Sequence, residues 1–179
     1  MRFGTPEPTT KFSQPDARTH VFALAGIFDL GSHSTDSGPR DAVALVWSME
    51  QRDDQGRRMY FYDWCNVNLH PKAKLGQRVA ALLGRPLSEE EQKDFDPWPL
   101  LGGCVSVRVG RNDKDRAIIA DCYPLDGEAI KPEQITDVPR YVEKFAPANY
   151  IEHMRREIRG EVDPEYAYLW VPQDDSTPI

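Results

Sequence analysis

The order of strand-like and helix-like segments between residues 19 and 127 constrains the fold of this chain more than any other feature. Three segments with strand character come first, one long segment with helical spacing follows, and two more strand-like segments end the region. We therefore expect a mainly β domain in which a single long helix separates the third strand from the fourth.

The first two strands are read from apolar runs bounded by turn-forming residues. Residues 20–30 (HVFALAGIFDL) form a long apolar segment, and Gly26 near its middle predicts the bulge or bend that a small barrel needs in order to close. Residues 31–40 are predicted to be a turn-forming connection, and residues 42–49 the second strand. An Asp/Gly turn over residues 53–56 then predicts a hairpin.

The third strand, residues 57–66, alternates strictly between two sets of side chains. One face carries Met59, Phe61, Asp63 and Cys65, and the other carries Arg58, Tyr60, Tyr62 and Trp64. The more apolar set is expected to face the core, but Asp63 interrupts it. The sequence therefore leaves open which of the two faces is the core.

A helix is predicted over residues 71–83, begun by Pro71 and ended by Gly84, and a capping box formed by Ser88 and Glu91 begins a second, short helix. Residues 105–109 and 116–123 are the last two strands. This is the order of the five-stranded Greek-key barrel known as the oligonucleotide/oligosaccharide-binding (OB) fold, which binds its ligand across strands 2 and 3, between two loops.

The chain is expected to divide into three parts. Residues 1–18 are predicted to be a mobile N-terminal arm, residues 19–127 the OB-fold domain, and residues 128–179 a C-terminal extension. Within the extension, residues 148–159 predict one helix, while the prolines at 132, 139 and 147 are expected to break the chain elsewhere. The chain ends in a short acidic tip with Asp174 and Asp175, most simply a solvated end.

Composition narrows the class of partner. The formal net charge of -7 argues against a protein that binds nucleic acid over its whole surface, although a local basic groove stays compatible with it. Three cysteines (Cys65, Cys104 and Cys122) fall in predicted strands without a CxxC pair, so we expect buried, reduced thiols in a cytoplasmic protein. No segment is apolar for long enough to span a bilayer, and none reads as a secretion signal.

The candidate binding residues are aromatic side chains on strands 2 and 3 and basic side chains near the strand ends. Bases stack on aromatic faces for roughly 1–3 kcal/mol each, while basic side chains neutralise phosphates. The same aromatic residues could instead be core, as large aromatic residues in barrel strands usually are. The basic residues of the helix (Lys72, Lys74 and Arg78) are expected on its solvated face. The predicted nucleic-acid-binding set is Trp47, Arg57, Arg58, Tyr60, Tyr62, Trp64, Arg108, Arg111, Lys114 and Arg116.

Catalytic signatures are absent from the sequence. The four histidines are far apart, and there is no HExxH motif, no zinc-ligand spacing, no phosphate-binding P-loop and no GxSxG motif. We therefore expect no enzyme activity, no metal and no cofactor. Clustered carboxylates of a nuclease would be the exception, and a metal-dependent activity assay would reveal it.

Four motifs between Leu24 and Gly127, a little over half of the chain, resemble a protein family encoded by bacteriophages and prophages. They are IFDLGS, LVWSMEQ, LLGRPLSEEEQKDFDPWPLLGGCVSV and IIADCYPLDG. The residues that fall on the family pattern are Gly84, Arg85, Glu90, Glu91, Phe95, Asp96, Leu100, Leu101, Gly102 and Cys104. The chain departs from the family at the exit of strand 3 (WCNVNLHPKAKL), and the region after Gly127 lies outside the match.

This resemblance implies a phage single-stranded DNA-binding protein of the OB type that acts in replication or recombination in the host cytoplasm, and it supplies no catalytic residue. The expected partners are single-stranded DNA and replication or recombination proteins, and the segment after Gly127 is a candidate dimer arm. The alternative is a non-catalytic protein-interaction module of a phage replication or assembly complex, which the acidic charge favours. Sugar binding by the same fold has only the aromatic residues in its favour.

Overall fold

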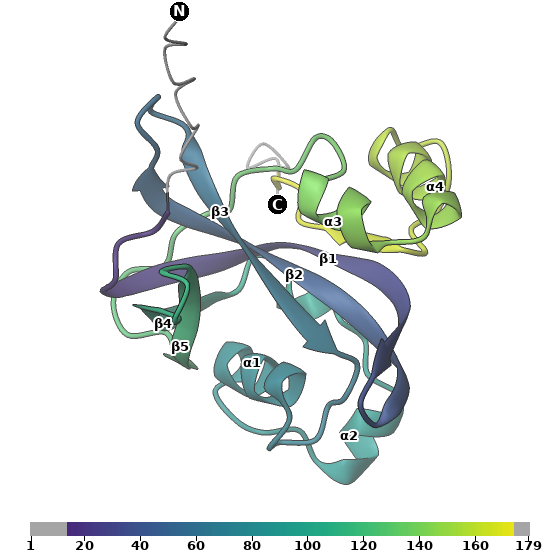
Figure 1. The fold of residues 1–179 in the computed structure, drawn as a ribbon, viewed down its shortest axis with the longest axis horizontal. Helices are drawn as coiled ribbons and strands as arrows, with labels where there is room; N and C mark the ends of the chain where they lie inside the picture. Colours follow the sequence, from purple (N-terminus) through teal and green to yellow (C-terminus); the bar gives the residue numbers. More distant parts are fainter. Residues whose placement is uncertain (1–13, 174–179) are drawn as a thin grey trace, which may run out of the picture.

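The computed structural model describes residues 14–173, so the acidic tip and most of the predicted N-terminal arm lie outside the described residues. Its centre is one antiparallel sheet with strand order β3-β2-β1-β4-β5, in which β6 also pairs with β1 (Figure 1). The strands are β1 (Thr19–Thr35), β2 (Gly38–Arg52), β3 (Arg58–Asn66), β4 (Cys104–Arg111), β5 (Ala117–Pro124) and β6 (Ala167–Leu169). The expected mainly β architecture is confirmed, as an open sheet.

The connection between β1 and β2 is shorter than the sequence suggested. Residues 31–40 were expected to be a turn, but β1 continues to Thr35, β2 begins at Gly38, and the two strands remain paired as far as Thr35 opposite Gly38. Most residues of this part of both strands are polar and exposed, although Gly31 is buried and His33 and Gly38 are half-buried. Such a ribbon is held by the backbone hydrogen bonds of the pair, so it needs no apolar pattern that a sequence could display.

Strand β1 contains the predicted irregularity at Gly26 and a second one that was not predicted. Its register against β2 shifts between Leu24 and Gly26, and again between Asp29 and Gly31. Each shift adds one residue to β1 and so changes which face the following side chains occupy. As a result, β1 supplies large apolar side chains to both faces of the sheet.

One face of the sheet packs against α1 (Lys74–Leu83) and the segment that follows it, which contains α2 (Glu89–Lys93) and the short 3-10 helix η1 (Trp98–Leu100). Helix α1 contacts both β3 and β5, the two edge strands. It ends at Gly84, whose φ of 76° is the left-handed conformation expected of a helix-terminating glycine. The α1-side core comprises Phe22, Leu24, Ile27, Leu45, Trp47, Met49, Met59, Cys65, Leu75, Val79, Ala81, Leu87, Leu100, Val105, Val107 and Val109.

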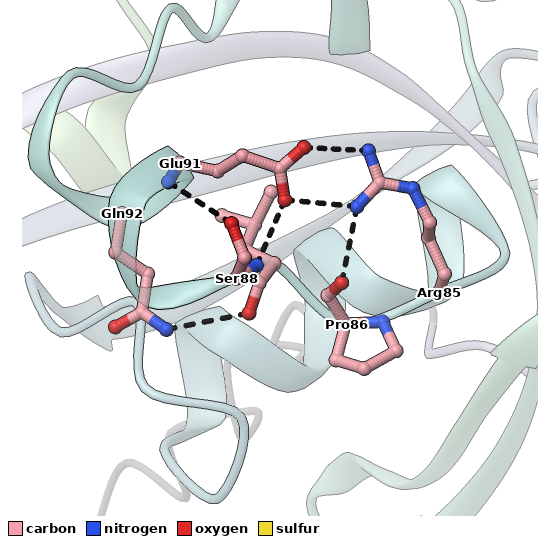
Figure 2. A network of polar contacts seen from close by, with 6 residues as sticks. Arg85, Pro86, Ser88, Glu91 and Gln92 are labelled. Atoms are coloured by element: carbon pink, nitrogen blue, oxygen red, sulfur yellow. Dashed lines mark hydrogen bonds and ion pairs between the residues drawn. The ribbon is translucent and has the colours of Figure 1, made fainter.

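The capping box predicted from Ser88 and Glu91 is present and is reinforced by an arginine (Figure 2). The Glu91 backbone N–H donates to the Ser88 hydroxyl (3.2 Å), and the Ser88 N–H donates to the Glu91 carboxylate (2.8 Å). Arg85 donates to both oxygens of the same carboxylate at 2.9 and 2.7 Å. The Arg85 hydrogen bonds, followed by that of Ser88, lower the pKa of Glu91 from 4.5 to about 2.

The other face of the sheet is covered by the extension, defined here as residues 128–173. It contains α3 (Arg140–Phe145), α4 (Ala148–Ile158) and β6, and Figure 1 shows α3 and α4 on the side of the sheet opposite α1. The extension-side core comprises Ala25, Phe28, Leu30, Ala42, Ala44, Val46, Ile135, Val138, Val142, Met154 and Ala167. None of the helices in the described part of the chain is long and apolar enough to cross a membrane.

The sequence predicted α4 but not α3 or β6. Pro139 and Pro147 were expected to break the extension, whereas each occupies the position just before a helix. A proline at the start of a helix loses no intrahelical hydrogen bond, because the first backbone N–H groups have no partner there. Pro139 and Pro147 therefore mark helix starts.

Candidate nucleic-acid interface

Both faces of β3 are covered, which answers the question that the sequence left open. Met59 and Cys65 lie in the α1-side core, and Phe61 packs against it. The interrupting residue, Asp63, is also on this face, where its carboxylate binds Arg78 (2.7 Å) and Lys74 (2.7 Å) of α1. Arg78 is buried, so the expectation that it lies on the solvated face of the helix is wrong.

The aromatic residues on the other face of β3 pack against the extension. Tyr62 stacks on Tyr141 with ring centres 5.2 Å apart and planes within 7°. Tyr60 donates its hydroxyl hydrogen to the Glu133 carbonyl oxygen (3.3 Å), and burial, followed by the charge of Glu133, raises the pKa of Tyr60 to about 12. These two rings are half-buried and already have partners within the chain.

Trp64 is the last aromatic residue of this face and lies at the end of the cover. Phe145 of α3 contacts it edge to face at 5.1 Å, and His33 of β1 does so at 4.7 Å. Its indole N–H donates to the side-chain oxygen of Asn66 (3.4 Å), which is exposed. Trp64 therefore borders a part of the sheet that the extension leaves open.

Trp47 does not belong to an accessible platform. It is completely buried in the α1-side core beside Phe22, with ring centres 6.2 Å apart. A base cannot reach its face without opening that core.

The energy that holds the extension on the sheet can be compared with the energy that bases would gain by stacking on the aromatic rings. Ile135, Val138, Val142 and Met154 are each at most 6% exposed. Burial of four such side chains contributes about 6–12 kcal/mol, whereas stacking of three bases contributes about 3–9 kcal/mol. The extension is further held by the Glu133 N–H, which donates to the Ser48 hydroxyl (3.0 Å). Base stacking at Tyr60 and Tyr62 would therefore compete with an attachment of comparable or greater energy.

The predicted basic residues at the start of β3 are engaged in local contacts. Arg57 forms an ion pair with Asp53 (2.9 Å) across the β2–β3 turn and is largely exposed. Arg58 donates to the Lys131 carbonyl oxygen (2.7 Å), so it fastens the extension to the sheet. Of the two, only Arg57 is open to a ligand.

The remaining four basic residues lie on the β4–β5 hairpin. Arg108 is paired with Asp121, and Arg111 donates to the Pro15 carbonyl oxygen (2.6 Å). Lys114 and Arg116 are exposed, and their side chains form no hydrogen bond or ion pair with residues 14–173. Among the described residues of this hairpin, they are the cations without an ion pair or a side-chain hydrogen bond.

Residues 14–18 connect the two hairpins. Gln14 accepts a hydrogen bond from the Ala117 backbone N–H (2.7 Å), and the Asp16 N–H donates to the side chain of Gln51 on β2 (3.0 Å). This part of the predicted arm is therefore ordered, and it links the β4–β5 hairpin to the end of β2.

Metal-dependent chemistry has no support from the arrangement of ligands. Within residues 14–173, no group of three or more histidine, cysteine, aspartate or glutamate side chains is placed to hold a metal ion. Burial raises the pKa of Cys65 to about 12 and of Cys122 to about 11, so these thiols stay protonated at neutral pH.

Comparison of the chain with models of known protein families finds no match, and comparison with curated proteins finds none either.

Proposed function

We propose that this protein binds single-stranded DNA with little sequence preference, through an OB-type barrel formed by β1–β5. The observation that carries the proposal is the element order, with β1, β2 and β3 before α1, β4 and β5 after it, and β1 between β2 and β4 in the sheet. Helix α1 contacts both edge strands, as expected of a helix that closes one end of a barrel. The phage-family motifs add support for a role in replication or recombination in a bacterial cytoplasm.

The accessible side chains suggest where the strand would lie. Because the extension covers Tyr60 and Tyr62, we assign the first phosphate contacts to Lys114 and Arg116 on the β4–β5 hairpin and to Arg57 on the β2–β3 hairpin. Trp64 is the ring best placed for stacking, since it borders the open end of the sheet. Exposed basic residues that replace condensed counterions make binding strongly salt-dependent.

The test is fluorescence anisotropy of a labelled oligo-dT of about 30 nucleotides, titrated with the full chain at about 50 and 200 mM salt. We expect the affinity to fall with salt and to drop by about tenfold or more in the double variant Lys114→Glu/Arg116→Glu, since each phosphate contact changes the salt slope by about 1. The matched control is Lys93→Glu/Lys144→Glu, which makes the same charge change on α2 and α3. Absence of binding at the lower salt concentration refutes the proposal.

A second candidate function is a protein-interaction module without DNA binding. The covered aromatic face and the net charge of -7 favour it. It predicts that the folded protein leaves the anisotropy of oligo-dT unchanged at every salt concentration.

A further inference from the structure

The extension leaves one end of the sheet open. Along β3 the extension contacts this face as far as Trp64, and the next residue on the same face, Asn66, is exposed. Across the sheet, Asn66 pairs with the buried Ala42 of β2, and beyond Ala42 the strand continues to the exposed Arg40. The open end is thus bounded by the β1–β2 turn on one side and by the exit of β3 on the other.

A polar cleft of about 390 Å³ lies at this open end. Its volume is within the range of roughly 300–1,000 Å³ that is usual for small-molecule sites. The lining residues are Thr35, Asp36, Ser37, Arg40, Asn66, Val67 and Asn68.

Hydrogen-bond donors predominate among the groups that remain available in the cleft. The side-chain oxygen of Asn66 already accepts from Trp64 (3.4 Å), and that of Asn68 accepts from the His70 backbone N–H (3.0 Å). Their amide NH₂ groups and the Arg40 guanidinium form no hydrogen bond with residues 14–173. A ligand that fits these groups carries several acceptors, as a phosphate and the carbonyl oxygens of a base do.

Two further residues refine the ligand class. Val67 is 53% exposed and lines the cleft together with the two asparagines, so it offers an apolar surface next to which a flat ring can pack. Asp36 also lines the cleft, and its negative charge repels an anion and so limits the affinity for a phosphate. The cleft therefore suits a ligand that combines one phosphate with an acceptor-rich ring.

We propose that this cleft holds one nucleotide of a bound single strand, with its phosphate at Arg40 and its base between Val67, Asn66 and Asn68. The inference rests on the proposed function and deepens it, because it adds Arg40, Asn66 and Asn68 to the residues that would contact the strand. It also gives the strand a way to reach the sheet without displacing the extension.

Two substitutions that change the charge of the cleft in opposite directions test the subsite in the same anisotropy assay. We expect Arg40→Ala to weaken oligo-dT binding by about three- to tenfold and to lower the salt slope by about 1, while Asp36→Asn strengthens binding. The matched control is Arg159→Ala, at the end of α4 and paired with Glu161. If the wild-type protein binds DNA and Arg40→Ala and Asp36→Asn both behave like it, the subsite is wrong and the proposed function stands; if the wild-type protein does not bind, both fail.

A direct measurement locates the ligand. In ¹⁵N–¹H NMR spectra of the full chain, we expect the side-chain NH₂ signals of Asn66 and Asn68 to shift on addition of a short oligo-dT. A parallel titration with thymidine 5'-monophosphate distinguishes a mononucleotide site, for which both ligands shift these signals, from a site that needs the strand, for which only the oligonucleotide does. Unchanged NH₂ signals under conditions in which DNA binds overturn the proposal.

Discussion

Asp63 is the residue on which the contact between β3 and α1 most depends. Its carboxylate is 3% exposed and binds Arg78, itself 7% exposed, at 2.7 Å. Burial alone lowers the pKa of Arg78, but the charge and hydrogen bond of Asp63 outweigh that effect and raise it. A buried pair of this kind contributes little beyond an apolar pair of equal size, yet losing one partner leaves an uncompensated charge.

We therefore expect Arg78→Met to lower the free energy of unfolding by about 3 kcal/mol, the lower end of the range for broken buried pairs, because Lys74 stays beside Asp63. Lys74→Met is the control, since Lys74 is 48% exposed, and it should cost about 1 kcal/mol or less. Urea unfolding followed by circular dichroism measures both. An equal loss of unfolding free energy in the two variants would show that burial does not determine the strength of the Asp63–Arg78 ion pair.

Glycine 76 controls how closely helix α1 packs on the loop before it. A Cβ added at this position would lie 2.0 Å from the carbonyl oxygen of His70. Alanine would favour the helix by about 1 kcal/mol, but a collision with backbone forces the loop to move. The steric effect dominates.

Gly76→Ala should accordingly destabilise the protein by about 2 kcal/mol or more. Gly110→Ala is the matched control, since its new Cβ would come no nearer than 3.5 Å to a neighbour, an ordinary contact with Ala120. Thermal unfolding of the two variants gives the comparison. Stabilisation by Gly76→Ala would mean that the loop adapts readily.

The capping box at the start of α2 makes part of the protein's stability depend on pH. Because the pKa of Glu91 is lowered from 4.5 to about 2, its contribution is complete above pH 4.5 and is lost as the pH falls towards 2. Arg85→Met should reduce stability at about pH 6 and have progressively less effect below pH 4.5. Urea midpoints of both proteins at several pH values test this, and a difference that does not change with pH would contradict it.

At the scale of elements, the sequence predicted those whose signals are local. The alternation of β3, the bulge at Gly26, the glycine stop of α1 and the capping box all depend on residues close together in the chain. The covering of Tyr60 and Tyr62 depends on Glu133 and Tyr141, which lie 73 and 79 residues later, and no local pattern records those contacts. The polar cleft around Arg40 was not predicted either, because it brings residues 35–40 next to residues 66–68.

The whole molecule has two hydrophobic cores that share one sheet. The extension supplies Ile135, Val142 and Met154 to the core that Phe28 and Leu30 of β1 complete. The predicted boundary at residue 127 therefore runs through a packed core, and neither part buries its apolar surface alone.

We expect the full chain to unfold in a single calorimetric transition whose van't Hoff and calorimetric enthalpies agree. A chain ending at residue 127 should aggregate or remain unfolded, because it exposes Phe28, Leu30 and Val46. Two resolved transitions, or a soluble folded fragment, would show that the extension is a separate domain.

The register shift after Leu24 has a consequence for how this chain tolerates change in length. Up to Leu24 the even-numbered side chains of β1 enter the α1-side core, whereas from Ile27 the assignment is reversed and Phe28 enters the other one. A single residue inserted between them would turn Phe28 and Leu30 towards the wrong layer, whereas removal of Ala25 or Gly26 would only remove the bulge, because Leu24 and Ile27 would then alternate regularly on the same face. This part of β1 is therefore expected to accept the loss of one residue more readily than the gain of one.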